Sequence, residues 1–139
     1  MVEEDLLKHL EFIQYIINRM AKNSFLLKGW TVTIVAAFFA LAAQNLDIKF
    51  VILSIFPVVT FWILDAFYLR QERLFRALYN DVRKNTDIQS KDPFSLDTSP
   101  YISNVQSWPR TAVSKTLIIF YGMILVTISI VIIILEFTL

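Results

Sequence analysis

Three long apolar runs dominate the pattern of hydrophobic and polar positions along the chain. They cover residues 25–43, 48–69 and 116–135, and the third contains no charged residue. Each run is close to the roughly 20 residues that a helix needs to cross the ~30 Å hydrocarbon core of a bilayer. Hydrocarbon offers no partner to free backbone groups, so a helix is the conformation expected for each run. The sequence therefore predicts an all-α integral membrane protein with three transmembrane helices in contact with the lipid bilayer.

A fourth segment, residues 2–23, has the pattern of an amphipathic helix outside the membrane. Its apolar positions follow a 4-3-4-3 spacing and form a short heptad-like seam. The members of this seam are Leu6, Leu10, Ile13, Ile17 and Met20. Three interpretations remain open. The seam packs on the chain's own second helix, it lies on the membrane surface, or it serves as an assembly surface for another molecule.

The second apolar run continues into a helical extension that reaches about residue 84. Residues 70–84 contain neither glycine nor proline, and Glu72 and Arg76 form a favourable i,i+4 pair. The arginines of this stretch are interpreted as anchors against lipid headgroups, so no nucleic-acid binding is predicted. The fold class is thus three transmembrane helices with cytosolic amphipathic helical extensions.

Residues 85–114 are predicted to form a cytosolic loop. Proline at 93, 100 and 109 disfavours helix at each preceding residue. The loop nevertheless carries several large apolar side chains, too many for a free linker. We expect an ordered segment, with one short turn of helix, that packs on the helical extensions.

The composition agrees with a single membrane domain. The chain has 139 residues, of which 56% are hydrophobic, above the roughly 45–50% of soluble domains. Its net charge is +1 and it has no cysteine, which excludes disulfide frameworks and thiolate chemistry.

The distribution of lysine and arginine predicts the orientation. Basic residues concentrate in the segment from Arg70 to Lys115, whereas the connection at residues 44–47 has none. Because cytoplasmic loops carry the excess of basic residues, the N-terminus and the long loop should be cytoplasmic. The short connection and the C-terminus should lie outside.

The residues show no pattern of catalytic chemistry. His9 is the only histidine and cannot by itself form a multi-ligand zinc site, so it is interpreted as a polar position on the first helix. Gly29 and Gly122 are the only glycines, which excludes a glycine-rich phosphate loop. We expect no enzyme activity, no cofactor and no metal.

Lys28 and Asp65 are the informative polar residues because charges inside membrane spans are costly. Each lies about 18 residues, or ~27 Å of helix, from the turn at residues 46–47. Equal counting predicts a continuous antiparallel hairpin in which the two form an ion pair. The alternatives are a lysine that snorkels to the headgroups and a polar ring that lines a pore after assembly. A further alternative for the hairpin is a new helix capped at Asn23-Ser24.

Two other features concern helix shape and packing. Pro57 lies in the middle of the second run, where it removes one backbone hydrogen bond and predicts a kink. Small side chains give the first run a face suited to close helix packing. They are Thr33, Ala36, Ala37, Ala40 and Ala43.

Three stretches together resemble a group of small bacterial three-span membrane proteins. They are RMAKNSFLLKGWTVTIVAAFFALAA (19–43), FWILDAFYLRQERLFRALYNDV (61–82), and DPFSLDTSPY (92–101) followed by SKTLIIFYG (114–122). The resemblance implies a bacterial inner (plasma) membrane location. By analogy with small multi-span effectors, it also implies a membrane-disrupting role in antiviral (anti-phage) defence.

Two functions follow from these expectations. The first is a homo-oligomeric membrane effector or pore subunit, which needs assembly because three helices enclose no channel. The second is a non-conducting membrane anchor whose cytosolic helices recruit a soluble partner. A transporter is third, because inverted repeats are missing from the sequence.

Overall fold

The computed structural model describes residues 2–84 and 95–138, and every secondary-structure element in these residues is helical. In chain order the elements are α1 (Val2–Asn45), α2 (Ile48–Leu53), α3 (Ile55–Lys84), the 3-10 helix η2 (Ser99–Asn104), α4 (Trp108–Ala112) and α5 (Lys115–Thr138). The predicted all-α class is confirmed. Most of the predicted loop 85–114 is described, but its first part, residues 85–94, lies outside the described residues.

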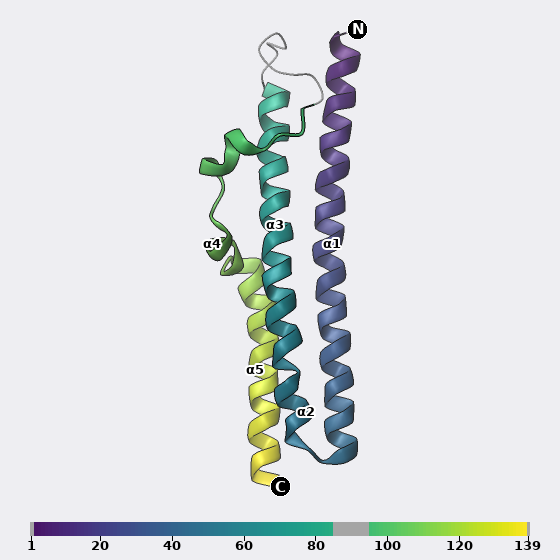
Figure 1. Cartoon of the computed structure of the whole chain (residues 1–139), viewed down its shortest axis with the longest axis vertical. Coiled ribbons are helices and arrows are strands. Elements are labelled where there is room, and N and C mark those ends of the chain that lie inside the picture. The colour runs from purple at the N-terminus through teal and green to yellow at the C-terminus, as the bar shows by residue number, and fades with distance from the viewer. Residues whose placement is uncertain (1, 85–94, 139) are drawn as a thin grey trace.

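α1 and α3 form one long antiparallel hairpin, with α5 beside α3 over its lower half (Figure 1). α1 continues without a break through Asn23 and Ser24, so the alternative of a new helix at that point is wrong. α1 ends at Asn45, and the next residue, Leu46, has a φ of 51° in the left-handed region. Asp47 N then bonds Ala42 O at 3.3 Å, which is the pattern of a Schellman cap. Asp47 also begins α2 as its N-cap, since its side chain accepts from Lys49 N at 3.0 Å.

The second apolar run is not one helix, as predicted, but two helices that meet at Ser54. The cause is Pro57, which lacks the N–H that the Leu53 carbonyl would accept and whose ring crowds that carbonyl. The buried Ser54 hydroxyl at this break donates to Val51 O at 2.5 Å, so it is satisfied within the same chain segment. The irregularity therefore lies three residues before the proline that was predicted to cause it.

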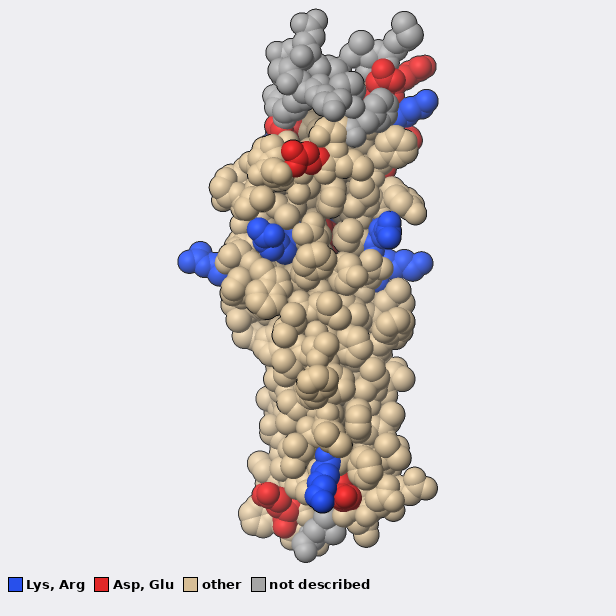
Figure 2. Space-filling view, in the orientation of Figure 1, with Lys and Arg blue, Asp and Glu red and all other residues tan. Residues whose placement is uncertain are grey.

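Three helices are long and apolar enough to cross a membrane, namely α1, α2 with α3, and α5. Less than a third of each apolar stretch is buried inside the protein. Figure 2 shows charged side chains toward the two ends of this face and a band without charge between them. Hydroxyl groups in the band donate to carbonyls of their own helix, as Thr33, Thr60 and Thr127 do. Apolar surface outside and satisfied hydroxyls are what hydrocarbon requires, which indicates a multi-pass membrane protein.

Beyond the band, residues 2–23 of α1 pack on residues 66–84 of α3, and we call this part the hairpin extension. Ile13 and Ile17 are 0% and 1% exposed, and they belong to one apolar cluster with side chains of α3 and η2. The α3 and η2 members of that cluster are Leu74, Leu78, Val82 and Tyr101. The seam on the first helix is therefore covered by the chain's own second helix.

Residues 95–114 form a strap that runs along α3 from the hairpin extension to the start of α5 (Figure 1). It contains two short helices, η2 and α4, rather than the single turn expected from the sequence. At one end the Tyr101 hydroxyl donates to the Asp81 carboxylate. At the other, Trp62 Nε1 donates to Ala112 O at 2.7 Å. The strap thus fixes the start of α5 against the middle of α3.

Candidate functional site

Four polar side chains from three helices meet where the hairpin extension joins the charge-free band. We call Ser24 and Lys28 of α1, Asp65 of α3 and Tyr121 of α5 the junction cluster. Lys28 Nζ lies 2.6 Å from Asp65 Oδ2 and donates to Ser24 Oγ at 2.9 Å. The Ser24 hydroxyl donates to the other carboxylate oxygen, Oδ1, and Tyr121 donates to Oδ2 at 2.8 Å. The structure thus brings Lys28 and Asp65 together, at the depth obtained by counting from the turn.

The backbone geometry explains why these positions meet. Two antiparallel helices joined by a short turn reach equal depth after equal numbers of residues. Ser24 precedes Lys28 by four residues on α1, so both side chains face α3. Tyr121 arrives from α5, where its ring stacks on Trp62 with centroids 5.7 Å apart and planes 4° from parallel. The strap holds Trp62 through Ala112, so it also helps to position Tyr121.

Asp65 is fully buried, and its carboxylate is fully paired. It accepts from Lys28, Ser24 and Tyr121, which gives both oxygens a donor. Leaving a buried charge without its partner costs about 3–5 kcal/mol. The cluster therefore links three helices, and removing any one of its four side chains should destabilise the fold.

The chemistry available to this cluster is limited. Lys28 donates to Ser24 while Ser24 donates to Asp65, so the lysine is not arranged as a base for the serine hydroxyl. No group of three or more histidine, cysteine, aspartate or glutamate side chains is arranged to hold a metal in the described part of the chain. The arrangement is that of a hydrogen-bonded ion pair that holds helices together.

Sequence reasoning found two members of the cluster and missed the other two. Ser24 was considered only as a helix cap, although its position four residues before Lys28 puts it on the same face. Tyr121 lies inside an uncharged run, where a phenolic hydroxyl needs a hydrogen-bond partner. The need for a partner marks Tyr121 as a residue of interest in the sequence. The partner itself cannot be predicted, because the long loop before α5 leaves the position of α5 relative to α3 undetermined.

The other residues singled out from the sequence lie apart from this cluster. Ile13 and Ile17 are buried and Leu6, Leu10 and Met20 are half-buried, so the seam is occupied within the chain. Pro57 lies in the first turn of α3, half-buried. His9 is buried on α1, where its Nε2 is 2.8 Å from Ser95 O and joins the strap to the hairpin extension.

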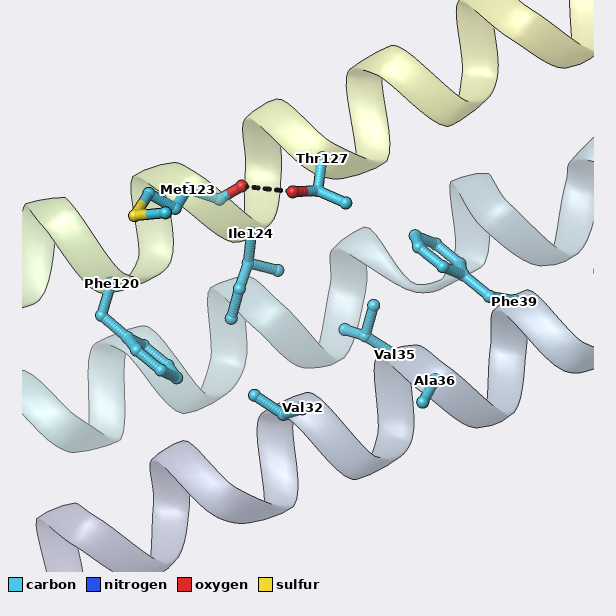
Figure 3. A pocket seen from close by; sticks show the side chains of 8 residues that line it. All are labelled: Val32, Val35, Ala36, Phe39, Phe120, Met123, Ile124 and Thr127. Atoms are coloured by element: carbon cyan, nitrogen blue, oxygen red, sulfur yellow. Dashed lines mark hydrogen bonds between the residues drawn. The ribbon is translucent and has the colours of Figure 1, made fainter.

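A second feature is an apolar groove between α1 and α5, with a volume of about 410 Å³ (Figure 3). Its walls come from the two helices alone, and its only hydroxyl, that of Thr127, is bonded to Met123 O. The lining residues are Val32, Val35, Ala36, Phe39, Phe120, Met123, Ile124 and Thr127. All five members of the predicted small-residue face of α1 are exposed, so this face does not pack closely against the chain's own helices; they are Thr33, Ala36, Ala37, Ala40 and Ala43.

The resemblance drawn from residues 19–43, 61–82, 92–101 and 114–122 rests on the sequence alone and stays a prediction. What the geometry itself establishes is a helical fold, three candidate membrane spans and a buried ion pair between them. No family model, no curated protein and no solved structure matches this chain.

Proposed function

We propose that the protein is a non-conducting, multi-pass membrane anchor whose cytosolic hairpin extension recruits a soluble partner. The observation that carries this proposal is the internal pairing of Lys28 and Asp65. Charges inside membrane spans usually mark ion paths or pair with each other. Lys28 and Asp65 pair with each other, so no ion path is needed to explain them. Thr33, Thr60 and Thr127 donate their hydroxyl protons to carbonyls of their own helices, so their presence in the spans requires no pore.

The hairpin extension supplies the surface for a partner. Phe12 and Tyr15, about one helical turn apart on α1, are 54% and 68% exposed. Tyr15 is 13 residues from Lys28, which corresponds to ~20 Å of helix beyond the junction cluster. At that distance no hydrocarbon covers these side chains. Exposed apolar groups in water favour contact with another protein.

The proposed location is a bacterial inner membrane with the N-terminus and the strap in the cytoplasm and the C-terminus outside. Support comes from the basic residues at the end of the band where the extension begins, including Arg70, Arg73 and Arg110. The chain has no cysteine, so single cysteines at Ser103 and Asn45 are clean probes. Only the Asn45 variant should react with an impermeant thiol reagent in intact cells. The reverse pattern would overturn the orientation.

The function itself is tested by expressing the protein in cells stained with a membrane-potential dye. An anchor leaves the potential unchanged at an expression level at which the protein is fully inserted. A biotin ligase fused to the N-terminus should then label a defined partner. Tyr15→Glu or Phe12→Glu should abolish that labelling, while Asn80→Glu, an exposed polar position on α3, should preserve it. Labelling that ignores all three substitutions would remove the hairpin extension as the docking surface.

The second candidate is a homo-oligomeric membrane effector or pore subunit, of the kind used in phage defence. It is favoured by the exposed small-residue face of α1, because such faces allow close helix association in membranes. This candidate expects depolarisation on expression and self-crosslinking through α1. A monomer by native mass spectrometry, together with an unchanged potential, would exclude it.

A further inference from the structure

We propose that the groove between α1 and α5 is a phospholipid site, in which an acyl chain fills the groove and the phosphate group accepts a hydrogen bond from Lys28. This inference goes beyond the proposed function and rests on it in one respect: a pore subunit assembled through the small-residue face of α1, to which the lining residue Ala36 belongs, would cover the groove. It rests on the groove's lining, on the position of Lys28 at one end of it, and on the acceptors available at that depth.

The groove needs an apolar occupant. Its lining is apolar apart from the Thr127 hydroxyl, which is already bonded to its own helix. A water molecule needs two to four polar partners, and the lining does not offer them. An empty groove would deprive the wall atoms of contact. Figure 3 shows Val32 and Phe39 along the α1 wall and Phe120 and Ile124 reaching toward them from α5.

Lys28 lies at the end of the groove nearest the hairpin extension. Val32, the first α1 residue of the lining, is one helical turn from Lys28. The ammonium also lies 5.8 Å from the centroid of the Phe120 ring, which is itself part of the lining. The uncharged part of α1 begins directly after Lys28, so this end of the groove is at the level expected for headgroups.

The Lys28 ammonium has donor capacity left for a phosphate. It carries three N–H groups, and within the described residues it donates to Ser24 and Asp65. Its side chain is 20% exposed, whereas that of Asp65 is fully buried. The exposed side of the cluster is therefore cationic, which is complementary to a phosphodiester oxygen.

A helix from a second copy would fit this end of the groove less well. In a copy of the same orientation, the acidic residue at the depth of Lys28 is Asp65, which is buried and paired. The next along α3 is Glu72, about 10 Å of helix away and bonded to Arg76. Over the described residues, a second copy thus brings no carboxylate to the third N–H of Lys28, whereas a phospholipid brings an anionic oxygen and an apolar chain together.

The groove is tested with the full-length protein in phosphatidylglycerol vesicles that contain a phospholipid with a photoreactive group midway along one acyl chain. Crosslinks mapped by mass spectrometry should concentrate on residues 32–39 and 120–127. Ala36→Trp fills the groove and should reduce crosslinking there about tenfold or more. Ala37→Trp, the exposed neighbour that does not line the groove, is the matched control and should leave it unchanged. Crosslinks spread evenly over all lipid-facing positions, or groove residues crosslinked to a second copy, would overturn the proposal.

The phosphate contact is tested separately with delipidated protein. Phosphatidylglycerol should bind about tenfold or more tightly than a diacylglycerol with the same chains, the effect of one charge-assisted hydrogen bond. The double variant Lys28→Gln/Asp65→Asn keeps the cluster neutral and hydrogen-bonded, and it should bring the two affinities together. Its helix content and monomer elution should match the wild type. Equal affinities in the wild-type protein would remove Lys28 from the site.

Discussion

Both halves of the α1–α3 hairpin bury apolar side chains, but they differ in the polar groups that they bury and in the side chains that they expose. In the hairpin extension, His9 is the one polar side chain among the buried residues described, and the others are apolar, such as Ile13, Ile17 and Leu74. In the charge-free band, exposed side chains include Val32 and Ile63. Fully buried there or at its edge are the polar groups Thr31, Ser54 and Asp65. One pair of helices is therefore built for water at one end and for hydrocarbon at the other.

The difference shows that different forces hold the two ends together. In water, burying apolar surface contributes about 25 cal/mol per Å², and the seam uses this effect. Between helices in lipid the same burial gives little, because acyl chains are as apolar as leucine, and association depends on close packing and hydrogen bonds. Polar substitutions should therefore matter most at the junction cluster, and apolar truncations should matter most in the hairpin extension.

The largest expected effect comes from reversing one charge of the junction cluster. Lys28→Asp or Asp65→Lys alone should cost about 3–5 kcal/mol of unfolding free energy, because each leaves like charges at a buried site. The swapped double variant should recover much of this loss through its coupling term. Reversible unfolding in mixed micelles measures all four proteins. Strictly additive losses would mean that the two side chains do not interact.

Truncating one apolar side chain in each half sharpens the comparison. Ile17→Ala should cost about 2–4 kcal/mol because it opens a cavity in the seam. Ile128→Ala removes the same atoms from an equally buried position of α5 in the charge-free band and should cost less, about 1–2 kcal/mol, because burial between apolar surroundings contributes little beyond close packing. The same micelle titration serves for both variants. Equal losses at the two positions would contradict the separation into a water-driven and a lipid-facing half.

Removing one hydroxyl from the cluster is expected to have a smaller effect. Tyr121→Phe keeps the ring stacked on Trp62 but deprives Asp65 Oδ2 of one of its two donors. The expected loss is about 1–2 kcal/mol. Tyr15→Phe on the exposed face of the hairpin extension is the control and should be neutral. A neutral Tyr121→Phe would show that Lys28 and Ser24 suffice for the carboxylate.

The smallest expected effect is an alkaline weakening of the strap. Burial, together with the charge of Asp97, raises the pKa of Tyr101, whose hydroxyl donates to Asp81. The unfolded chain loses this proton near pH 10 while the folded chain still holds it. Stability is therefore lost as the pH rises from about 10 through the folded pKa. Melting temperatures from about pH 9 to 11 should fall less in Tyr101→Phe than in the wild type, and equal slopes would contradict this assignment.

Local counting predicted much of this molecule. The three helices follow from run length, and the depth match of Lys28 with Asp65 follows from a fixed rise per residue on both sides of a short turn. The predicted kink at Pro57 lies three residues after the observed break at Ser54. The reason is that a proline disturbs the carbonyl four positions before it rather than its own position. The strap's second short helix was also missed, since its prolines suggested a loop but allow helix at their own positions.

By itself, then, the sequence determined which segments are helices, how long they are and which residues of the hairpin share a level, because these depend on neighbours along the chain. Only the tertiary structure decided which faces turn inward. It placed the Tyr121 hydroxyl on Asp65, packed α3 against the seam at Ile13 and Ile17, and left the predicted small-residue face of α1 exposed. The physical reason is that helix rotation and the position of α5 follow from side-chain packing among all three helices. Counting residues from a short turn places α1 relative to α3, but it cannot place α5, because the connection before α5 is long.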